Sequence, residues 1–189
     1  MSKFLNTQSS FLIMIDIQEK LLPAIFNQTE ILNNSIKLLT AAQTLNVPLI
    51  VSRQYPKGIG DTVSELKKLL PENLTPIDKT EFSVCQNEKF SDAFLNLKFD
   101  SGSRDTAILF GVESHICVLG TAIDLIEKYN LNVVIAADAT GSRTEANHKL
   151  ALEAAKNFGC MIYPVETIIY QMLGQAGTPE FKKLLPLFK

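Results

Sequence analysis

Short, uninterrupted runs of apolar residues alternate along this chain with longer stretches in which apolar residues recur at helical spacing. Runs rich in Ile, Leu and Val without polar alternation are typical of strands buried on both faces of a sheet. The stretches between them predict helices, as the spacing of Leu32, Ile36 and Leu39 illustrates. The pattern predicts six strands, at residues 11–15, 48–52, a weaker one near 74–77, 106–110, 133–137 and 161–163.

This alternation of strand and helix predicts an α/β fold with a doubly wound, mainly parallel six-stranded sheet flanked by helices, a Rossmann-like three-layer sandwich. Right-handed crossovers and the strand order 3-2-1-4-5-6 follow from the same pattern. The chain has 189 residues, 46% of them hydrophobic, and its composition shows no break. We therefore expect a single domain over residues 1–189 with one good-sized core.

Polar residues ahead of the helical stretches predict where helices begin. Thr62 with Glu65, and Ser142 with Glu145, have the spacing of a capping box, in which a side-chain oxygen accepts a hydrogen bond from the first turn. Near the end of the chain, Thr178 is the expected cap of a short helix that begins at about residue 180.

Charge and cysteine content limit the classes of partner and compartment. With 18 Lys and Arg against 20 Asp and Glu, the net charge is -2, and no basic stripe or polybasic patch appears. We therefore expect no nucleic acid and no membrane as partner, but a small molecule or further copies of the chain. Three cysteines at irregular spacing argue against a disulfide framework, and the apolar run at 11–15 is too short for a signal sequence. These features predict a cytoplasmic protein.

The strongest candidate for chemistry is Cys117, which follows the apolar run 106–110 and Gly111 and falls in the first turn of a helical stretch. The first turn of a helix has backbone N–H groups without intrahelical partners and carries partial positive charge. A thiol there is expected to ionise more easily, and an oxyanion finds donors close by.

Two further ionisable residues also follow predicted strands. Asp16 ends the first strand, and Lys79 follows the weak third strand. Ligands of doubly wound sheets gather at the carboxyl ends of the strands, and strands 1 and 4 are neighbours in the predicted order, so Asp16 and Cys117 can meet while Lys79 reaches across. A carboxylate can take the proton of the thiol, and an ammonium group favours the thiolate.

Four motifs give the chain a resemblance to a known family. They are Ile-Asp-Ile-Gln at 15–18, Lys-Thr at 79–80, Gly-Val-Glu-Ser-His-Ile-Cys at 111–117 and Ala-Asp-Ala-Thr at 137–140. In order and spacing they resemble the isochorismatase-like cysteine hydrolases, a superfamily that includes the nicotinamidases, and the resemblance spans nearly the whole chain. The stretch 54–60 is similar to the subgroup of isochorismatase domain-containing proteins.

The resemblance implies a role for each residue of a catalytic triad. Asp16 would be the general base, Lys79 the group that lowers the pKa of the thiol and orients the substrate, and Cys117 the nucleophile. A cis peptide bond between Val112 and Glu113 is also implied, with the N–H groups of Glu113 and Cys117 forming an oxyanion hole. The implied reaction is hydrolysis of a small amide or related acyl compound through a thioester. A homo-oligomer, either dimer or tetramer, is implied as well.

Four residues are candidates for substrate binding by their position relative to these motifs: Gln18, Tyr55, Phe82 and Glu113. A core or surface role is the alternative for each. No cofactor is predicted. Nicotinamidases carry metal-binding histidines after the second strand, whereas residues 52–56 here contain none, and no pair of Cys or His has zinc spacing. We therefore expect no metal site.

Several alternatives remain open from the sequence. The chain could be a catalytically silent binding or scaffold protein with the same fold, because fold does not imply activity. Isochorismatase-type ether hydrolysis is a second alternative, which the resemblance makes less favourable because the enzymes of that type lack the cysteine. Metal-assisted hydrolysis is a third. Cys117 could also be a buried apolar residue, Asp16 a helix cap and Lys79 a solvated charge. His115 is expected to point away from Cys117, and His148 to lie on the surface.

Overall fold

The structure is a computed structural model that describes residues 5–101 and 104–189, with the backbone alone for residues 98–101. The expected domain over residues 1–189 thus includes six residues, 1–4 and 102–103, outside the described part. Six strands form one parallel sheet in the order β3-β2-β1-β4-β5-β6, which confirms the predicted fold class and strand order. The strands are β1 Ser10–Ile15, β2 Leu49–Gln54, β3 Ile77–Lys79, β4 Thr106–Val112, β5 Asn132–Gly141 and β6 Met161–Tyr163.

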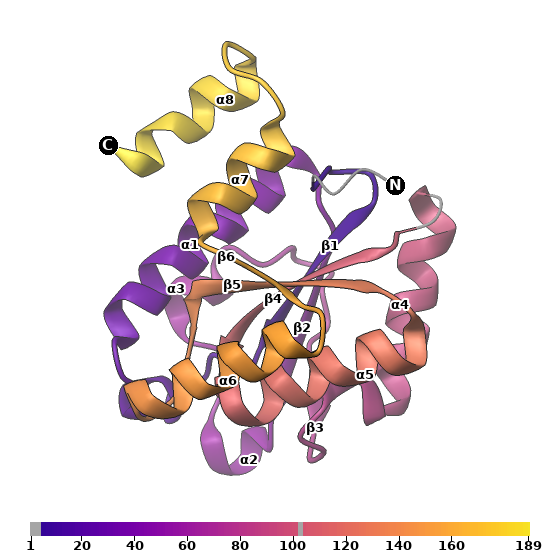
Figure 1. Cartoon of the computed structure of the whole chain (residues 1–189), viewed down its shortest axis with the longest axis vertical. Helices are drawn as coiled ribbons and strands as arrows, with labels where there is room; N and C mark the ends of the chain where they lie inside the picture. Colours follow the sequence, from indigo (N-terminus) through magenta and orange to yellow (C-terminus); the bar gives the residue numbers. More distant parts are fainter. Residues whose placement is uncertain (1–4, 102–103) are drawn as a thin grey trace.

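Helices cover both faces of this sheet. Helices α1 and α7 pack on one face, and α4, α5 and α6 pack on the other (Figure 1). The α-helices are α1 Gln28–Leu45, α2 Pro56–Ile59, α3 Ser64–Lys67, α4 Glu88–Ser101, α5 Leu119–Tyr129, α6 Glu145–Asn157, α7 Val165–Leu173 and α8 Pro179–Leu184. Shorter helical turns lie at Leu22–Ala24, Val84–Gln86, Ser114–Val118 and Leu185–Phe188.

Strand β1 shows why the strands are apolar without alternation. All six of its residues are buried. Leu12 and Met14 belong to the core under α1 and α7, whereas Phe11, Ile13 and Ile15 belong to the core under α4, α5 and α6. Because both faces are covered, the five consecutive residues after Ser10 all carry apolar side chains. This strand then leads directly into Asp16 at the carboxyl edge of the sheet.

Two strands differ from their predicted bounds by more than two residues at one end, and the other strands agree within two residues. The third, expected near 74–77, runs over Ile77–Lys79, so that Lys79 is the last residue of a strand and not part of a loop. Strand β5, expected to end at 137, continues to Gly141, and its pairing with β4 shifts register between Leu109 and Gly111. The sequence analysis predicted β5 too short because Asp138 and Thr140 are polar, whereas buried strands are recognised by continuous apolar runs.

The capping predictions were right once and wrong twice. Thr178 caps α8, accepting a hydrogen bond from the N–H of Phe181 at 3.0 Å. Helix α6 is capped by Thr144, not by Ser142, whose hydroxyl bonds to a histidine. Val63 precedes α3 without a side-chain cap, and Thr62 instead forms an isolated antiparallel bridge with Gln18. A polar side chain that finds a tertiary partner, as Ser142 does, is not available as a local cap.

Within residues 5–101 and 104–189, no helix combines the length and the apolar character needed to cross a bilayer.

Gly111 should be the least replaceable glycine of the sheet. Its φ is +121°, and a Cβ built on it would lie 2.0 Å from the backbone oxygen of Ile15 on β1. Gly159 has a φ of +99° but nothing within 4 Å of such a Cβ, which makes it a matched control. We expect Gly159→Ala to lower the free energy of unfolding by about 1 kcal/mol through backbone strain, and Gly111→Ala by more than about 3 kcal/mol. Urea denaturation measures both, and equal losses would contradict the close packing of β1 on β4.

Candidate active site

Asp16 lies at the carboxyl end of β1 in the left-handed region of backbone space, with a φ of 52°. Its side chain is fully buried. One carboxylate oxygen, Oδ1, accepts a hydrogen bond from the hydroxyl of Ser52 at 2.8 Å, and the other, Oδ2, accepts one from Nζ of Lys79 at 2.7 Å. The carboxylate is therefore held at both oxygens by side chains of the two strands beyond β1, which fixes its orientation.

Lys79 lies at the end of β3, and its side chain has no exposure to solvent. A buried ammonium group is costly unless several partners replace water. The Nζ atom has five neighbours within hydrogen-bond range: Oδ2 of Asp16 at 2.7 Å, Oε1 of Gln54 at 2.5 Å, the carbonyl oxygens of Glu81 at 3.2 Å and Phe82 at 3.3 Å, and Sγ of Cys117 at 3.7 Å. The three residues predicted from the sequence thus meet around one ammonium group.

Cys117 lies in the helical turn Ser114–Val118 and is 7% exposed. Burial raises the pKa of its thiol to about 12, and the charge and hydrogen bonding of Asp16 act in the same direction. Lys79 lowers that pKa, as expected from the sequence, but by less. The expectation of a thiol that ionises readily was therefore wrong. At neutral pH the sulfur carries a proton beside a carboxylate.

Two residues of this site were missed by the sequence analysis. Ser52 donates to Asp16, and Gln54 accepts from Lys79 while its own Nε2 donates to the carbonyl of Thr80 at 2.9 Å. Both residues are on β2, the strand between β1 and β3. A usable signal was present, because the apolar strand β2 becomes polar at its carboxyl end, where residues two apart lie on the same face.

Gln18 differs from its predicted role in substrate binding. Its side chain is fully buried, and all of its described hydrogen bonds are to backbone atoms. It accepts from the N–H of Gln54 at 2.7 Å and donates to the carbonyls of Gln54 at 3.0 Å and Gly60 at 2.7 Å. Gln18 thus fixes the backbone beside Lys79 and the loop after β2, and offers no atom to a ligand.

The two aromatic candidates are exposed at the edge of the same site. Tyr55 is 54% exposed and follows Gln54, and its N–H donates to the carbonyl of Lys79 at 2.8 Å. Phe82 is 64% exposed, and its carbonyl accepts from the Lys79 ammonium group. Both side chains are therefore available to a ligand above the buried Lys79.

Glu113 has a buried carboxylate that already has a partner. The peptide bond between Val112 and Glu113, for which the resemblance implies a cis conformation, is cis in the structure. Oε2 of Glu113 accepts from both the N–H of Arg143 at 3.0 Å and its Nε at 3.1 Å. The carboxylate is therefore neutralised by an arginine, which leaves the backbone of Glu113 as its contribution to the site.

The histidines do not contact the thiol in the described structure. Nδ1 of His115 lies 2.9 Å from the hydroxyl of Ser142, in agreement with its predicted direction away from Cys117. His148 was expected on the surface, but it is half-buried, and its Nδ1 lies 2.8 Å from the hydroxyl of Ser114. The two histidines therefore attach the Ser114–Val118 turn to its neighbours, His115 to the residue that follows β5 and His148 to helix α6.

The other two cysteines are also buried, unpaired thiols. Burial raises the pKa of Cys85 to about 12 and that of Cys160 to about 11. Within the described ranges, no group of three or more His, Cys, Asp or Glu side chains is arranged to hold a metal ion.

The raised pKa of Cys117 gives a testable pH dependence. Since the thiolate is the reactive form, we expect its alkylation by iodoacetamide to keep rising between pH 7 and 10, about tenfold per unit, without a plateau. Asp16→Asn removes a negative charge that raises the thiol pKa, so alkylation at pH 7.5 should become several-fold faster. Mass spectrometry of the Cys117 peptide measures the rate. Ser52→Ala, which keeps the Asp16 charge, is the control, and slower labelling of Asp16→Asn would contradict the assignment.

Comparison with known proteins shows which family this chain is similar to. The Isochorismatase domain matches residues 10–167. The chain is 37% identical over 183 residues to isochorismatase domain-containing protein 2 of Danio rerio, covering 97% of this chain and 88% of that protein. It is 36% identical to a solved structure described as the MAR1 ribonuclease of Caenorhabditis elegans, with a TM-score of 0.89 and coverage of 98% and 92% of the two chains.

A more distant structure shares the fold. The YcaC gene product of Escherichia coli, described as an octameric hydrolase of unknown specificity, superimposes with a TM-score of 0.89 at 21% identity, over 99% of this chain and 91% of that one. The match of the domain over most of the chain, together with the similarity to the Danio rerio protein, shows that this chain belongs to the isochorismatase family.

Proposed function

We propose that this chain is a cysteine hydrolase that cleaves a small amide or related acyl compound through a thioester on Cys117. The observation that carries the proposal is the position of the Lys79 ammonium group, 2.7 Å from the Asp16 carboxylate and 3.7 Å from the Cys117 sulfur in a buried site. Membership of the isochorismatase family supports a hydrolase. Nucleophile, base and cation are the three groups that acyl transfer to sulfur requires.

The raised thiol pKa defines the first step. When the substrate displaces water above Cys117, the thiol proton passes to Asp16 as the sulfur attacks the carbonyl carbon. The negative charge then moves from the carboxylate to the carbonyl oxygen, where the backbone N–H groups of Glu113 and Cys117 are the proposed donors. The C–N bond breaks as the nitrogen takes the proton from Asp16, and the amine or ammonia leaves a thioester on the enzyme.

Hydrolysis of the thioester repeats the steps with water. Asp16 takes a proton from water, the resulting hydroxide attacks the thioester carbonyl, and the sulfur leaves as the acid forms. The proton on Asp16 returns to the sulfur, which restores the resting thiol. The Lys79 ammonium group stays bonded to Oδ2 of Asp16 and so keeps the carboxylate in place between the steps. No step in this sequence uses a metal or a cofactor.

The exposed side chains of Tyr55 and Phe82 are proposed to contact the substrate above the triad. A homo-oligomer is also proposed. The distant YcaC structure is described as an octamer, and a second copy packed on two exposed aromatic side chains would close the site. The predicted cytoplasmic location stays a prediction.

Two other functions, a scaffold without turnover and cleavage of RNA, can be distinguished from this proposal by an activity assay. A scaffold protein would keep the pocket without turnover. Cleavage of RNA is a second possible function, because the similar Caenorhabditis elegans structure is described as a ribonuclease. The net charge of -2 gives this chain little electrostatic attraction for a polyanion such as RNA. In addition, Asp16, Lys79 and Cys117 are buried. We therefore keep hydrolysis of a small acyl compound as the proposal.

A screen of small amides tests this function directly, with a chelator in every assay. For a substrate found this way, we expect Cys117→Ala and Asp16→Asn to lower kcat/KM at least about 1000-fold, because nucleophile and base act together. Gln54→Leu, which removes an acceptor from Lys79, should lower kcat by about tenfold with less effect on KM. Cys160→Ala, another buried thiol removed, is the matched control and should keep wild-type activity. Turnover that survives Cys117→Ala would exclude the proposed nucleophile.

A further inference from the structure

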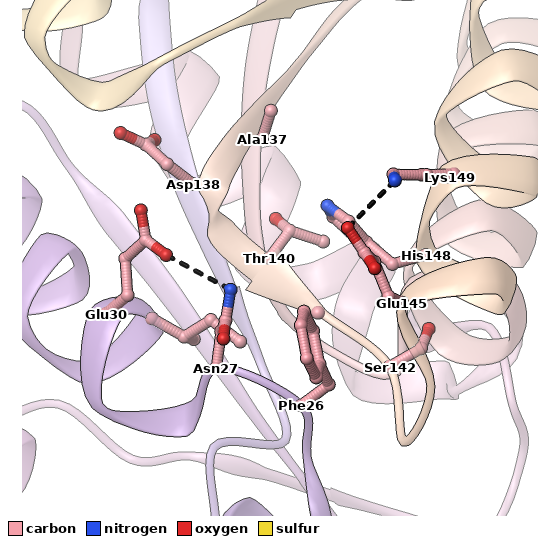
Figure 2. A pocket seen from close by; sticks show the side chains of 12 residues that line it. Phe26, Asn27, Glu30, Ala137, Asp138, Thr140, Ser142, Glu145, His148 and Lys149 are labelled. Carbon is pink, nitrogen blue, oxygen red and sulfur yellow. Dashed lines mark hydrogen bonds and ion pairs between the residues drawn. The ribbon is translucent and has the colours of Figure 1, made fainter.

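A cavity lies at the carboxyl end of β5, between the first turns of α1 and α6 (Figure 2). Its volume is about 270 Å³, close to the lower limit of about 300 Å³ for ligand pockets. Asp16, Lys79 and Cys117 are absent from its walls. The cavity is therefore separate from the triad, and the function proposed above does not use it.

The charge in this cavity is negative. Figure 2 shows Glu30 and Asp138 on the same side with their carboxylates near one another. Across from them, Glu145 is paired with Lys149 at 2.8 Å, so this pair contributes no net charge. Burial raises the pKa of Asp138, and the charge of Glu30 raises it further. The hydrogen bond that Oδ1 of Asp138 accepts from the N–H of Val165 at 2.8 Å opposes this rise, as does the charge of Lys37 to a smaller extent. A cation placed between the two carboxylates would relieve their repulsion.

Thr140 supplies an independent indication of a ligand. It is 2% exposed and forms part of the wall, and in the view of Figure 2 it lies between Glu30 and Asp138 on one side and His148 on the other. Its hydroxyl has no hydrogen-bond partner within the described residues. An unsatisfied buried hydroxyl costs about 1 to 3 kcal/mol, and such groups in native proteins call for an explanation. A donor or acceptor group of a ligand would remove this cost.

The opposite wall is fixed and carries no free positive charge. Nδ1 of His148 is held by the Ser114 hydroxyl at 2.8 Å, and the Ser142 hydroxyl is held by His115 at 2.9 Å. Burial lowers the pKa of His148, which keeps its ring neutral at pH 7. The wall thus needs no reordering when a ligand enters, and it does not repel a cation.

Two other ligand classes fit less well. Helix N-termini favour anions, and two helices begin at this cavity, but Glu30 and Glu145 already occupy their first turns. A metal ion would need three or more ligating side chains, and the described residues present no such group. Apolar contact is also available, because Phe26 lines the opening and is 42% exposed.

We propose that this cavity binds a small organic cation with a primary ammonium group, which lies beside Glu30 and Asp138 and within reach of the Thr140 hydroxyl. The short apolar part of the ligand contacts Phe26. This site is distinct from the thiol site, so it exists whether or not Cys117 performs catalysis.

Three probes of equal length separate charge from shape: butylammonium, 1-butanol and butyrate. Saturation-transfer NMR titrations of the full chain give the Kd of each. We expect butylammonium to bind at least tenfold more tightly than butanol, and butyrate not to bind. Glu30→Gln and Asp138→Asn should each weaken butylammonium binding at least fivefold, and Thr140→Val, which keeps the shape, about threefold.

Glu153→Gln is the matched control, because it removes one negative charge from an exposed position of α6 outside the cavity. It should leave the Kd within a factor of two, as should Cys117→Ala, which also separates this site from the proposed hydrolase. Butylammonium binding that is equally strong in Glu30→Gln, Asp138→Asn and Glu153→Gln would overturn the proposal. So would tighter binding of butyrate or butanol.

Discussion

Lys79 and Asp16 form an ion pair 2.7 Å long in which neither side chain has any exposure to solvent. Removing two charges from water is costly, and their mutual attraction compensates only where further hydrogen bonds satisfy the remaining atoms. Here Ser52 supplies the second bond to the carboxylate, and Gln54 with two backbone carbonyls surrounds the ammonium group. Loss of either partner would leave an uncompensated buried charge. The pair therefore constrains the residues around it, which must supply hydrogen bonds to both charged groups.

The parallel sheet explains how residues so far apart in sequence reach one another. Asp16 ends β1, Ser52 and Gln54 end β2, and Lys79 ends β3, and these strands are adjacent in the order β3-β2-β1. Since parallel strands place their carboxyl ends on one edge, two crossovers bring the polar groups of these three strands together. Strand β4, on the other side of β1, adds the turn with Cys117. The site therefore follows from topology more than from any local motif.

The strands and Asp16 could be predicted from the sequence, whereas the pKa of Cys117 and the partners of Gln18 and Ser142 could not. The strands were predictable because burial on both faces leaves continuous apolar runs, and Asp16 stood out directly after one. The pKa of Cys117 was not, because it depends on how much burial outweighs the charge of Lys79. Gln18 was misjudged because its amide bonds to distant backbone atoms, and Ser142 because its hydroxyl bonds to His115 instead of capping α6.

The protonated resting state of Cys117 gives the site a specific character. A thiol with a pKa of about 12 is a poor nucleophile. In the proposed mechanism it gains reactivity only when a bound carbonyl accepts the charge that Asp16 gives up. Such a site resists unselective modification of its cysteine. His148 and Ser142 line the separate acidic cavity at β5, and their hydrogen bonds hold the turn that contains Cys117, so the two proposed ligand sites adjoin the same turn.

The central claim is that Cys117 passes its proton to its buried carboxylate neighbour as it attacks the substrate, and carries the acyl group between the two half-reactions. Mass spectrometry of the intact protein, quenched in acid during turnover of an activated ester, tests this most directly. The account predicts an adduct with the mass of the acyl group on the peptide that contains Cys117, and no adduct on that peptide in Cys117→Ala under the same conditions. An adduct on Cys85 or Cys160 instead, or turnover without any adduct on Cys117, would contradict it.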